Sequence, residues 1–265
     1  MEQFVEFASQ LIPNYKQLIR GASSEEIMHF EQLVGFPLPQ TYKEYLFQMG
    51  HNNGGVELIC DGTTDLTDLI EFYEQEIVPG YDEAPPDCII IGIGGTIVEE
   101  ISLQFAPFLE PRMVFSGGGI VNSLCAESFD KFIFRSVFIQ EQHRTFSHFR
   151  PLISTNNKLL IKQSHDIAVS LGFQPLWFSD SIAFCGKKDH ATISMIQGEH
   201  SHALTIKIAT QQESEMNRIM AVLTDKLGVN SGFSSSSPDF ATSPYSVTNQ
   251  DRNVRPVRQA EVVTE

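Results

Sequence analysis

The chain has 265 residues, of which 42% are hydrophobic, so it is long enough to bury the cores of two domains. Its formal net charge of −15 lies almost entirely in the first half: residues 1–150 carry 8 Lys and Arg against 22 Asp and Glu, a net −14, and residues 151–265 carry 10 against 11, a net −1. Such an acidic field repels phosphate backbones and anionic membranes and attracts basic proteins, which argues against direct binding to nucleic acid or a membrane.

The first elements in the chain are predicted to be helices. Apolar residues recur at helical spacing over residues 4–11, and Pro13 is expected to end or kink this helix before a short second turn at 18–19. Ser23 and Glu26 then have the spacing of a capping box, in which each side chain satisfies a backbone amide of the other residue. A helix is therefore predicted to begin at Ser23.

Residues 23–55 predict two helices and the joint between them. Apolar side chains at helical spacing over residues 27–34 lead to Gly35, a residue type that commonly ends helices, and Pro37 prevents continuation. Residues 39–50 predict a second helix, which opens on a first-turn proline and carries an apolar face. The run Asn-Asn-Gly-Gly that follows predicts a tight turn.

Downstream of this turn the pattern changes to that of strands. Alternating apolar residues over 56–60 predict a half-buried strand, and an acidic stretch of mixed helix and loop follows. Residues 88–93 predict a central strand, which is expected to pair through a glycine turn with residues 96–103. A later strand at 113–115 and a helix with an inward apolar face over 129–137 complete this half of the chain.

Together these signals resemble the SUKH superfamily, whose members have an acidic capped helix, a Gly-Phe-Pro-Leu-Pro joint, a Tyr-containing helix and an Asn-Gly turn in this order. The resemblance continues through the hairpin at 87–103, the strand at 113–115 and the helix at 126–132, and covers about the first 148 residues. The superfamily includes bacterial immunity proteins, fungal regulators of cell-wall synthesis and Suppressor of Fused. The resemblance implies an α+β fold, in which N-terminal helices pack on a largely antiparallel sheet with a closing helix.

A second unit is predicted after a linker at 143–151, where periodicity is lost. Thr155 is expected to cap a helix that runs to Gly172, and a final amphipathic helix over 216–227 is expected to end at Gly228. Four short strands are predicted between them, at residues 174–178, 181–186, 191–197 and 203–209. The order helix, four strands, helix indicates a small two-layer α+β domain.

These patterns divide the chain into a SUKH-like domain at 1–149, a small α+β domain at 150–228 and a tail at 229–265. The tail is rich in Ser, Pro, Asn and Thr, with few apolar residues to offset the entropy of ordering, so we expect it to be disordered. Three roles stay open for the second domain, namely a wider partner interface, a homodimer contact or a small-ligand site, because its near-neutral charge favours none of them.

Enzymatic patterns have weak support in this sequence. Glycine-rich runs at 92–95 and 116–119 could hold a phosphate through backbone amides, but neither is followed by the Lys-Ser or Lys-Thr of a nucleotide loop. Turns and a hairpin explain both runs more simply. Cys125 near Ser128 has no sequence context that marks it as a nucleophile, and a buried structural cysteine is favoured.

We expect no metal site, cofactor or disulfide. Cys185 with His190, His200 and His202 fits no compact zinc pattern. The four cysteines are scattered without a Cys-x-x-Cys pair, which favours reduced, buried thiols. The amino terminus lacks the pattern of a secretion signal, and no apolar run approaches the length of a membrane span, so a cytoplasmic protein is expected.

Between Lys43 and Arg112 the sequence has no Lys or Arg but many carboxylates. For individual residues of this run, such as Asp65, Asp68, Glu71 and Glu74, three alternatives stay open: solvated surface side chains, an acid–base pair or a site for a hard cation. The run as a whole is self-repulsive, and a basic partner would relieve this repulsion. The carboxylates expected to bind a partner are Glu57, Asp61, Asp65, Asp68, Glu71, Glu74, Glu76, Asp82, Glu83, Glu99 and Glu100.

The leading hypothesis rests on the SUKH resemblance and on this acidic run. It is a non-enzymatic immunity protein that binds a cognate bacterial toxin with a basic surface, often a nuclease, and neutralises it by occlusion. The first alternative is a regulatory protein-interaction module like the fungal members of the superfamily. The second alternative is an enzyme that uses the glycine runs to bind a phosphorylated substrate. A homodimer is compatible with each of these hypotheses.

Overall fold

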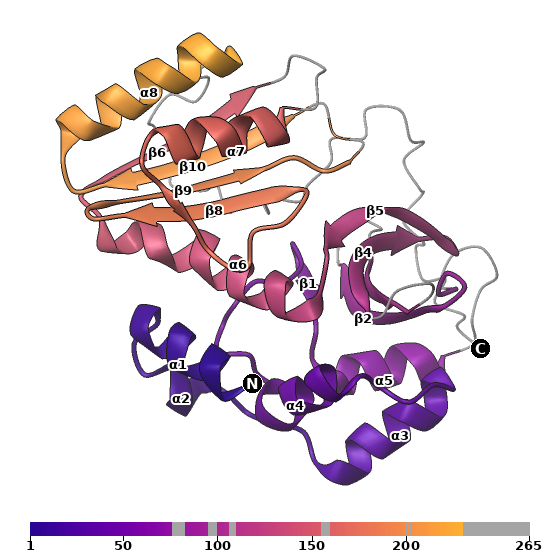
Figure 1. Ribbon diagram of the computed structural model, residues 1–265. Helices are drawn as coiled ribbons and strands as arrows, with labels where there is room; N and C mark the ends of the chain where they lie inside the picture. Colours follow the sequence, from indigo (N-terminus) through magenta and orange to yellow (C-terminus); the bar gives the residue numbers. More distant parts are fainter. Residues whose placement is uncertain are drawn as a thin grey trace, which may run out of the picture.

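The computed structural model in Figure 1 describes residues 1–75, 83–94, 100–105, 110–154, 160–199, 201 and 203–229. Two antiparallel five-stranded sheets dominate this part of the chain, each accompanied by helices. The first sheet lies above the N-terminal helices, and the second lies between α6 on one face and α7 and α8 on the other (Figure 1). The mixed α+β fold with antiparallel sheets that the sequence predicts is therefore confirmed.

The N-terminal helices follow the signals that the sequence carries. They are α1 (Glu2–Leu11), α2 (Tyr15–Leu18), α3 (Ser24–Val34) and α4 (Gln40–Met49). The predicted capping box is present, with the Ser23 amide donating to Glu26 Oε2 at 2.8 Å and the Glu26 amide donating to Ser23 Oγ at 3.2 Å. Gly35 ends α3 in the left-handed region, with φ of 72°.

The first sheet has the strand order β1-β2-β3-β4-β5, in which every neighbouring pair is antiparallel. Its strands are β1 (Gly62–Thr63), β2 (Cys88–Gly94), β3 (Glu100–Gln104), β4 (Arg112–Gly117) and β5 (Ile120–Ala126). The predicted central strand is β2, which pairs with β3 as expected. Gly118 and Gly119 have φ of 62° and 76° in the β4–β5 hairpin turn, so this glycine run shapes a turn.

The strand predicted at 56–60 is wrong. Leu58 and Ile59 are both buried, so the alternation that a half-buried strand requires is absent. The Glu57 backbone pairs instead with one side chain of α6, because its amide donates to Gln140 Oε1 at 3.0 Å and its carbonyl accepts from Gln140 Nε2. The side-chain amide of Gln140 thus takes the place of a neighbouring strand as hydrogen-bond partner, and the segment is held against α6.

Two helices frame the rest of the first half. These are α5 (Leu66–Glu74), which packs against α3 and β2, and α6 (Phe129–Glu141). Ser128 caps α6 by accepting from the Lys131 amide at 3.2 Å. Most residues of α6 are buried, since the helix touches α1, α4, β4 and β5 and also carries the aromatic contacts of the second unit. The closing helix is therefore the shared support of both halves.

The second sheet has the strand order β6-β10-β9-β8-β7. Its strands are β6 (His148–Ser154), β7 (Gln174–Pro175), β8 (Ala183–Lys188), β9 (Ala191–Ile196) and β10 (Leu204–Thr210). Helices α7 (Ile161–Ser170) and α8 (Glu213–Leu227) pack on it, and their apolar faces form a second core with β8, β9 and β10. The four predicted strands are present at about the predicted positions, and both helices are present as well.

The linker predicted at 143–151 is wrong, because a short 3₁₀ helix (Gln142–Thr145) is followed directly by β6. Pro151 misled the prediction, since proline interrupts most strands. Here it pairs opposite Lys207 on a strand that has a single neighbour among the described strands, an edge position that tolerates the missing amide. The predicted domain boundary at 149/150 consequently falls inside a strand.

A buried ion pair joins the two halves of the chain. Arg135 on α6 donates to both carboxylate oxygens of Asp180, at 2.9 Å and 3.0 Å, and both side chains are fully buried. Arg135 also donates to the Cys125 carbonyl, and Asp180 accepts from the Glu127 amide at 3.2 Å. Phe178 and Ile182 complete the junction by joining the core of the first half. Burial makes this pair costly to break, so it fixes how the halves meet.

Some predictions lie outside the described residues. These are the Thr155 cap and residues 230–265 of the tail, for which disorder is expected from the sequence; Val229, the first residue of that predicted tail, is buried. All four cysteines are free, and Cys60 is the one that is not fully buried. No helix among the described residues is long and apolar enough to span a membrane.

Candidate partner-binding site

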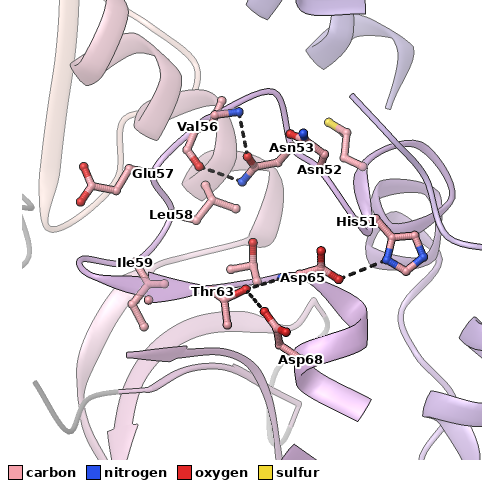
Figure 2. A pocket seen from close by; sticks show the side chains of 14 residues that line it. His51, Asn52, Asn53, Val56, Glu57, Leu58, Ile59, Thr63, Asp65 and Asp68 are labelled. Atoms are coloured by element: carbon pink, nitrogen blue, oxygen red, sulfur yellow. Dashed lines mark hydrogen bonds and ion pairs between the residues drawn. The ribbon is translucent and has the colours of Figure 1, made fainter. Parts of the chain in front are cut away.

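A pocket of about 300 Å³ opens where α4 ends, between the Asn-Gly turn and the start of α5. Figure 2 shows its side chains, which come from the turn, from the segment held by Gln140, from β1 and from α5. Glu57, Asp65 and Asp68 line it, and no Lys or Arg is among the described residues that do so. We call it the acidic pocket.

The turn forms one wall of the acidic pocket through side-chain contacts with its own backbone. Asn52 Oδ1 accepts from the Gly54 amide at 2.8 Å, and Asn53 Oδ1 accepts from the Gly55 amide at 3.2 Å. Asn53 also donates to the Val56 carbonyl at 2.7 Å, as Figure 2 shows. Both glycines have φ above +70°, a conformation that other residues rarely adopt. The Asn-Asn-Gly-Gly sequence therefore specifies this wall locally, as predicted.

Thr63 orients the carboxylates on the opposite wall. Its hydroxyl donates to Asp68 Oδ2 at 2.7 Å and accepts from the Asp65 amide at 3.0 Å (Figure 2). Asp65 caps α5 by accepting from the Thr67 amide at 2.9 Å. These contacts leave further acceptor positions on each carboxylate, because one carboxylate can accept about four hydrogen bonds. The wall thus presents oriented negative charge.

His51 lines the acidic pocket and connects the N-termini of two helices. Its Nε2 lies 3.1 Å from Glu26 Oε1 of the α3 capping box, and its Nδ1 lies 3.1 Å from Oδ1 of Asp65, the α5 cap. Burial works to lower the pKa of His51, but the hydrogen bonds to Asp65 and Glu26 outweigh it and the pKa is raised. Hydrogen bonds from Ser23, with His51 contributing, lower the pKa of Glu26 to about 2.

Glu57 supplies the third carboxylate of the acidic pocket. Burial, with repulsion from Asp61, raises the pKa of Glu57, and the positive charge of Lys207 on β10 opposes this shift. Burial in turn lowers the pKa of Lys207, which Glu57 opposes. A basic residue of the second half therefore acts on the acidic run of the first, which the sequence pattern did not indicate.

The structure sorts the predicted acidic residues into different environments. Asp68, Glu71 and Glu74 are exposed along one side of α5, where residues three apart share a face, and Glu74 lies 2.8 Å from His29 Nε2. Asp61 and Glu83 are exposed in loops. Glu76, Asp82 and Glu99 lie outside the described residues.

Glu100 is a correction to the predicted partner surface. It is only 6% exposed, in β3 opposite Ser116, so its carboxylate is not available to a partner on the surface. The pattern of like charges does not distinguish this position from its exposed neighbours, but residues 100–103 of β3 are all buried, so both faces of the strand are covered here.

Four residues of this region were missed by sequence reasoning. His51, Thr63, Gln140 and Lys207 organise the predicted carboxylates, yet no local pattern marks them, because each acts on residues that are distant in the sequence or in another element. Chemically, the site offers hydrogen-bond acceptors and negative charge. No group of three or more His, Cys, Asp or Glu side chains within the described part of the chain is placed to hold a metal ion.

Comparison with protein families identifies part of the chain. Residues 21–135 match the SMI1 / KNR4 family (SUKH-1), which confirms the SUKH resemblance for that region. The matched region begins just before α3, includes all the described lining residues of the acidic pocket and ends at Arg135 in α6. No curated protein and no solved structure matches the chain.

Proposed function

Because residues 21–135 match the SMI1 / KNR4 family (SUKH-1), we propose that this protein is an immunity protein that binds a cognate bacterial toxin and neutralises it by occlusion. It acts in the cytoplasm as a binding protein and turns over no substrate. The observation that carries the proposal is the acidic pocket, which Glu57, Asp65 and Asp68 line without a Lys or Arg among the described lining residues. A basic surface on the toxin is the matching chemistry.

Negative charge contributes mainly to the rate of encounter. Surface charges of one sign raise association rates by about 10- to 1,000-fold, and salt screens this effect over about 8 Å at physiological ionic strength. The exposed side of α5 extends the negative field beyond the pocket through Asp68, Glu71 and Glu74. Toxin association is therefore expected to slow steeply as salt is added, while dissociation changes less.

The direct test pairs this protein with the toxin domain encoded next to its gene. Co-expression is expected to restore growth of cells that produce the toxin, and calorimetry is expected to show a one-to-one complex. A variant carrying Glu57→Gln, Asp68→Asn and Glu71→Gln keeps side-chain size but removes three charges, and it is expected to associate at least about tenfold more slowly.

The control variant carries Glu213→Gln, Asp225→Asn and Glu199→Gln, which remove the same charge from exposed positions in the second half. It is expected to associate like the wild type. Failure of the unaltered protein to bind or protect against that toxin would sink the proposal. A gene with no toxin neighbour, together with capture of signalling proteins, would favour the regulatory alternative instead.

A further inference from the structure

The single tryptophan of the chain is exposed beside a second pocket. Trp177 lies in the loop between β7 and β8, and 57% of its surface is accessible, the largest fraction among the exposed large apolar residues of the described chain. It borders a pocket of about 510 Å³ that is also lined by residues of α1, α4 and α6. We call this the tryptophan pocket.

The indole is held in place by other aromatic rings. Its ring centre lies 4.7 Å from that of Phe134, at 69°, and 5.7 Å from that of Phe178, at 82°. Phe178 is 2% exposed, and two residues later in the same loop Asp180 forms the buried ion pair with Arg135. Two neighbouring residues of α6 therefore support the loop: Phe134 through its ring contact with Trp177, and Arg135 through its ion pair with Asp180. A side chain fixed in this way loses little entropy when a partner binds.

The charges around the tryptophan pocket are mostly negative. Glu2, Glu44 and Asp130 line it, no Lys or Arg is among its described lining residues, and the amino group of Met1 lies 3.3 Å from Glu44 Oε2. Burial raises the pKa of Asp130, as do the charges of Glu110 and Glu44, against the opposing charge of the amino terminus. Another cation would therefore be favoured between the carboxylates and the indole.

We propose that the tryptophan pocket receives an Arg or Lys side chain of the basic partner, so that both halves of the chain contribute to the partner interface. A cation over an indole face gains energy from the ring quadrupole, and the nearby carboxylates add Coulomb attraction. Tryptophan and arginine are also the residues most often found at the energetic centres of protein interfaces. The partner's identity rests on the proposed function, but the chemistry of the pocket is testable without it.

The tryptophan provides its own probe, because fluorescence excited at wavelengths that select tryptophan reports on one position in the full chain. The probe ligand is a blocked tetra-arginine peptide, and its neutral counterpart is the citrulline peptide of the same length and shape. The arginine peptide is expected to change the emission saturably, and the citrulline peptide is not. An equal response to both peptides would overturn the proposal, because binding would then not depend on the positive charge of the peptide.

Variants assign the response to the pocket. A double variant with Glu44→Gln and Asp130→Asn is expected to bind the arginine peptide about three- to tenfold more weakly, and calorimetry with Trp177→Phe is expected to show a loss of about the same size. The control removes two charges elsewhere, through Glu213→Gln and Asp225→Asn, and is expected to bind as the wild type does. Thermal unfolding verifies that each variant is folded. Equal weakening in the control would mean general charge attraction and would overturn the proposal.

Binding to the toxin separates this inference from the proposed function. If Trp177→Phe leaves toxin dissociation unchanged while the variant of the acidic pocket slows association, the proposed function stands and the inference fails. If the arginine peptide binds as expected but no toxin does, the pocket chemistry stands and the proposed function fails. Faster toxin dissociation from Trp177→Phe, by about threefold or more, supports both.

Discussion

The two halves of the chain place their charge in contrasting ways. In the second half, Glu215 forms ion pairs with both Lys188 and Arg218, so opposite charges neutralise one another. The sheet of this half is also regular, since β10 pairs with β6 and β9 without a register shift. In the first, β2–β3 and β4–β5 contain register shifts, and carboxylates gather at a turn and along a helix. Regular pairing builds a scaffold, whereas loops and bulges are the places where exposed side chains most often serve binding. The exposed Trp177 also lies in a loop, at the edge of the second sheet.

The strongest test of this contrast breaks the contact between the halves. Arg135→Met leaves the Asp180 carboxylate buried without its cation, and is expected to lower the free energy of unfolding by about 3–5 kcal/mol, measured by urea denaturation of the full chain. Lys131→Met, which removes a partly exposed ion pair with Glu127 from the same helix, is expected to cost about 1 kcal/mol or less. Similar losses for the two variants would contradict a locked junction.

The next largest effect concerns the wall of the acidic pocket. A Cβ on Gly54 would lie 2.3 Å from the buried ring of Tyr15, and the φ of +76° is strained for alanine. Gly54→Ala is therefore expected to cost about 2–4 kcal/mol. Gly55→Ala is the matched control, since its φ is +83° but nothing lies within 4 Å of the added atom, and it is expected to cost about 1–2 kcal/mol. Thermal unfolding of both variants measures the difference, and equal shifts would show that the Tyr15 contact does not matter.

The two halves are expected to respond to pH in opposite directions. Because the folded-state pKa of His51 is raised, its stabilising contribution is present below the unfolded-state pKa of about 6.5 and is lost as pH rises through the folded-state value. Burial lowers the pKa of His165 in α7, with Asp180 and Asp166 opposing, so its contribution is present above about 6.5 and is lost as pH falls.

Unfolding free energies of the wild type, His51→Gln and His165→Gln between about pH 5 and pH 8.5 test this directly. The difference between wild type and His51→Gln is expected to shrink as pH rises. The difference between wild type and His165→Gln is expected to grow over the same interval. Parallel slopes for the two variants would contradict the assigned environments.

The smallest expected changes in unfolding free energy compare repulsion between like charges on α5 with attraction within an ion pair on α8. Glu71 lies three residues from both Asp68 and Glu74 on α5, so Glu71→Gln is expected to stabilise the protein by about 0.2–0.5 kcal/mol. Arg218→Gln removes a contact of 2.8 Å to Glu215 on α8 and is expected to destabilise by a similar amount. Denaturation in low salt measures both changes, and the same sign for the two would weaken the contrast.

Most of the fold was predictable because its signals are local. The Ser23–Glu26 capping box, the Gly35 helix end and the strand at 88–93 each depend on residues close in sequence, and all are present. Two errors, at 56–60 and 143–151, occur where distant contacts override local pattern. Gln140 takes the place of a strand partner in one, and β10 pairs with a proline-containing strand in the other.

The candidate site was predictable in its charge but not in its geometry. Composition alone indicated that the acid lies in the first half, and that half contains the acidic pocket. Which carboxylates line the same pocket depended on the tertiary structure, in which Glu100 is buried and Glu57 lies beside the same cavity as Asp65 and Asp68. A run of like charges contains no information about which members face one cavity.

By itself, the sequence determined the α3 capping box, the Gly35 helix end, the Asn-Gly turn and the sign of the field around the first half, because each depends on neighbouring residues or on composition. The tertiary structure alone decided that His51 joins two helix N-termini, that Arg135 meets Asp180 and that Trp177 stays exposed beside carboxylates. These features depend on residues from different elements, and only the packing of those elements places them together, around α6 for Arg135 and Trp177 and between the N-terminal helices and α5 for His51.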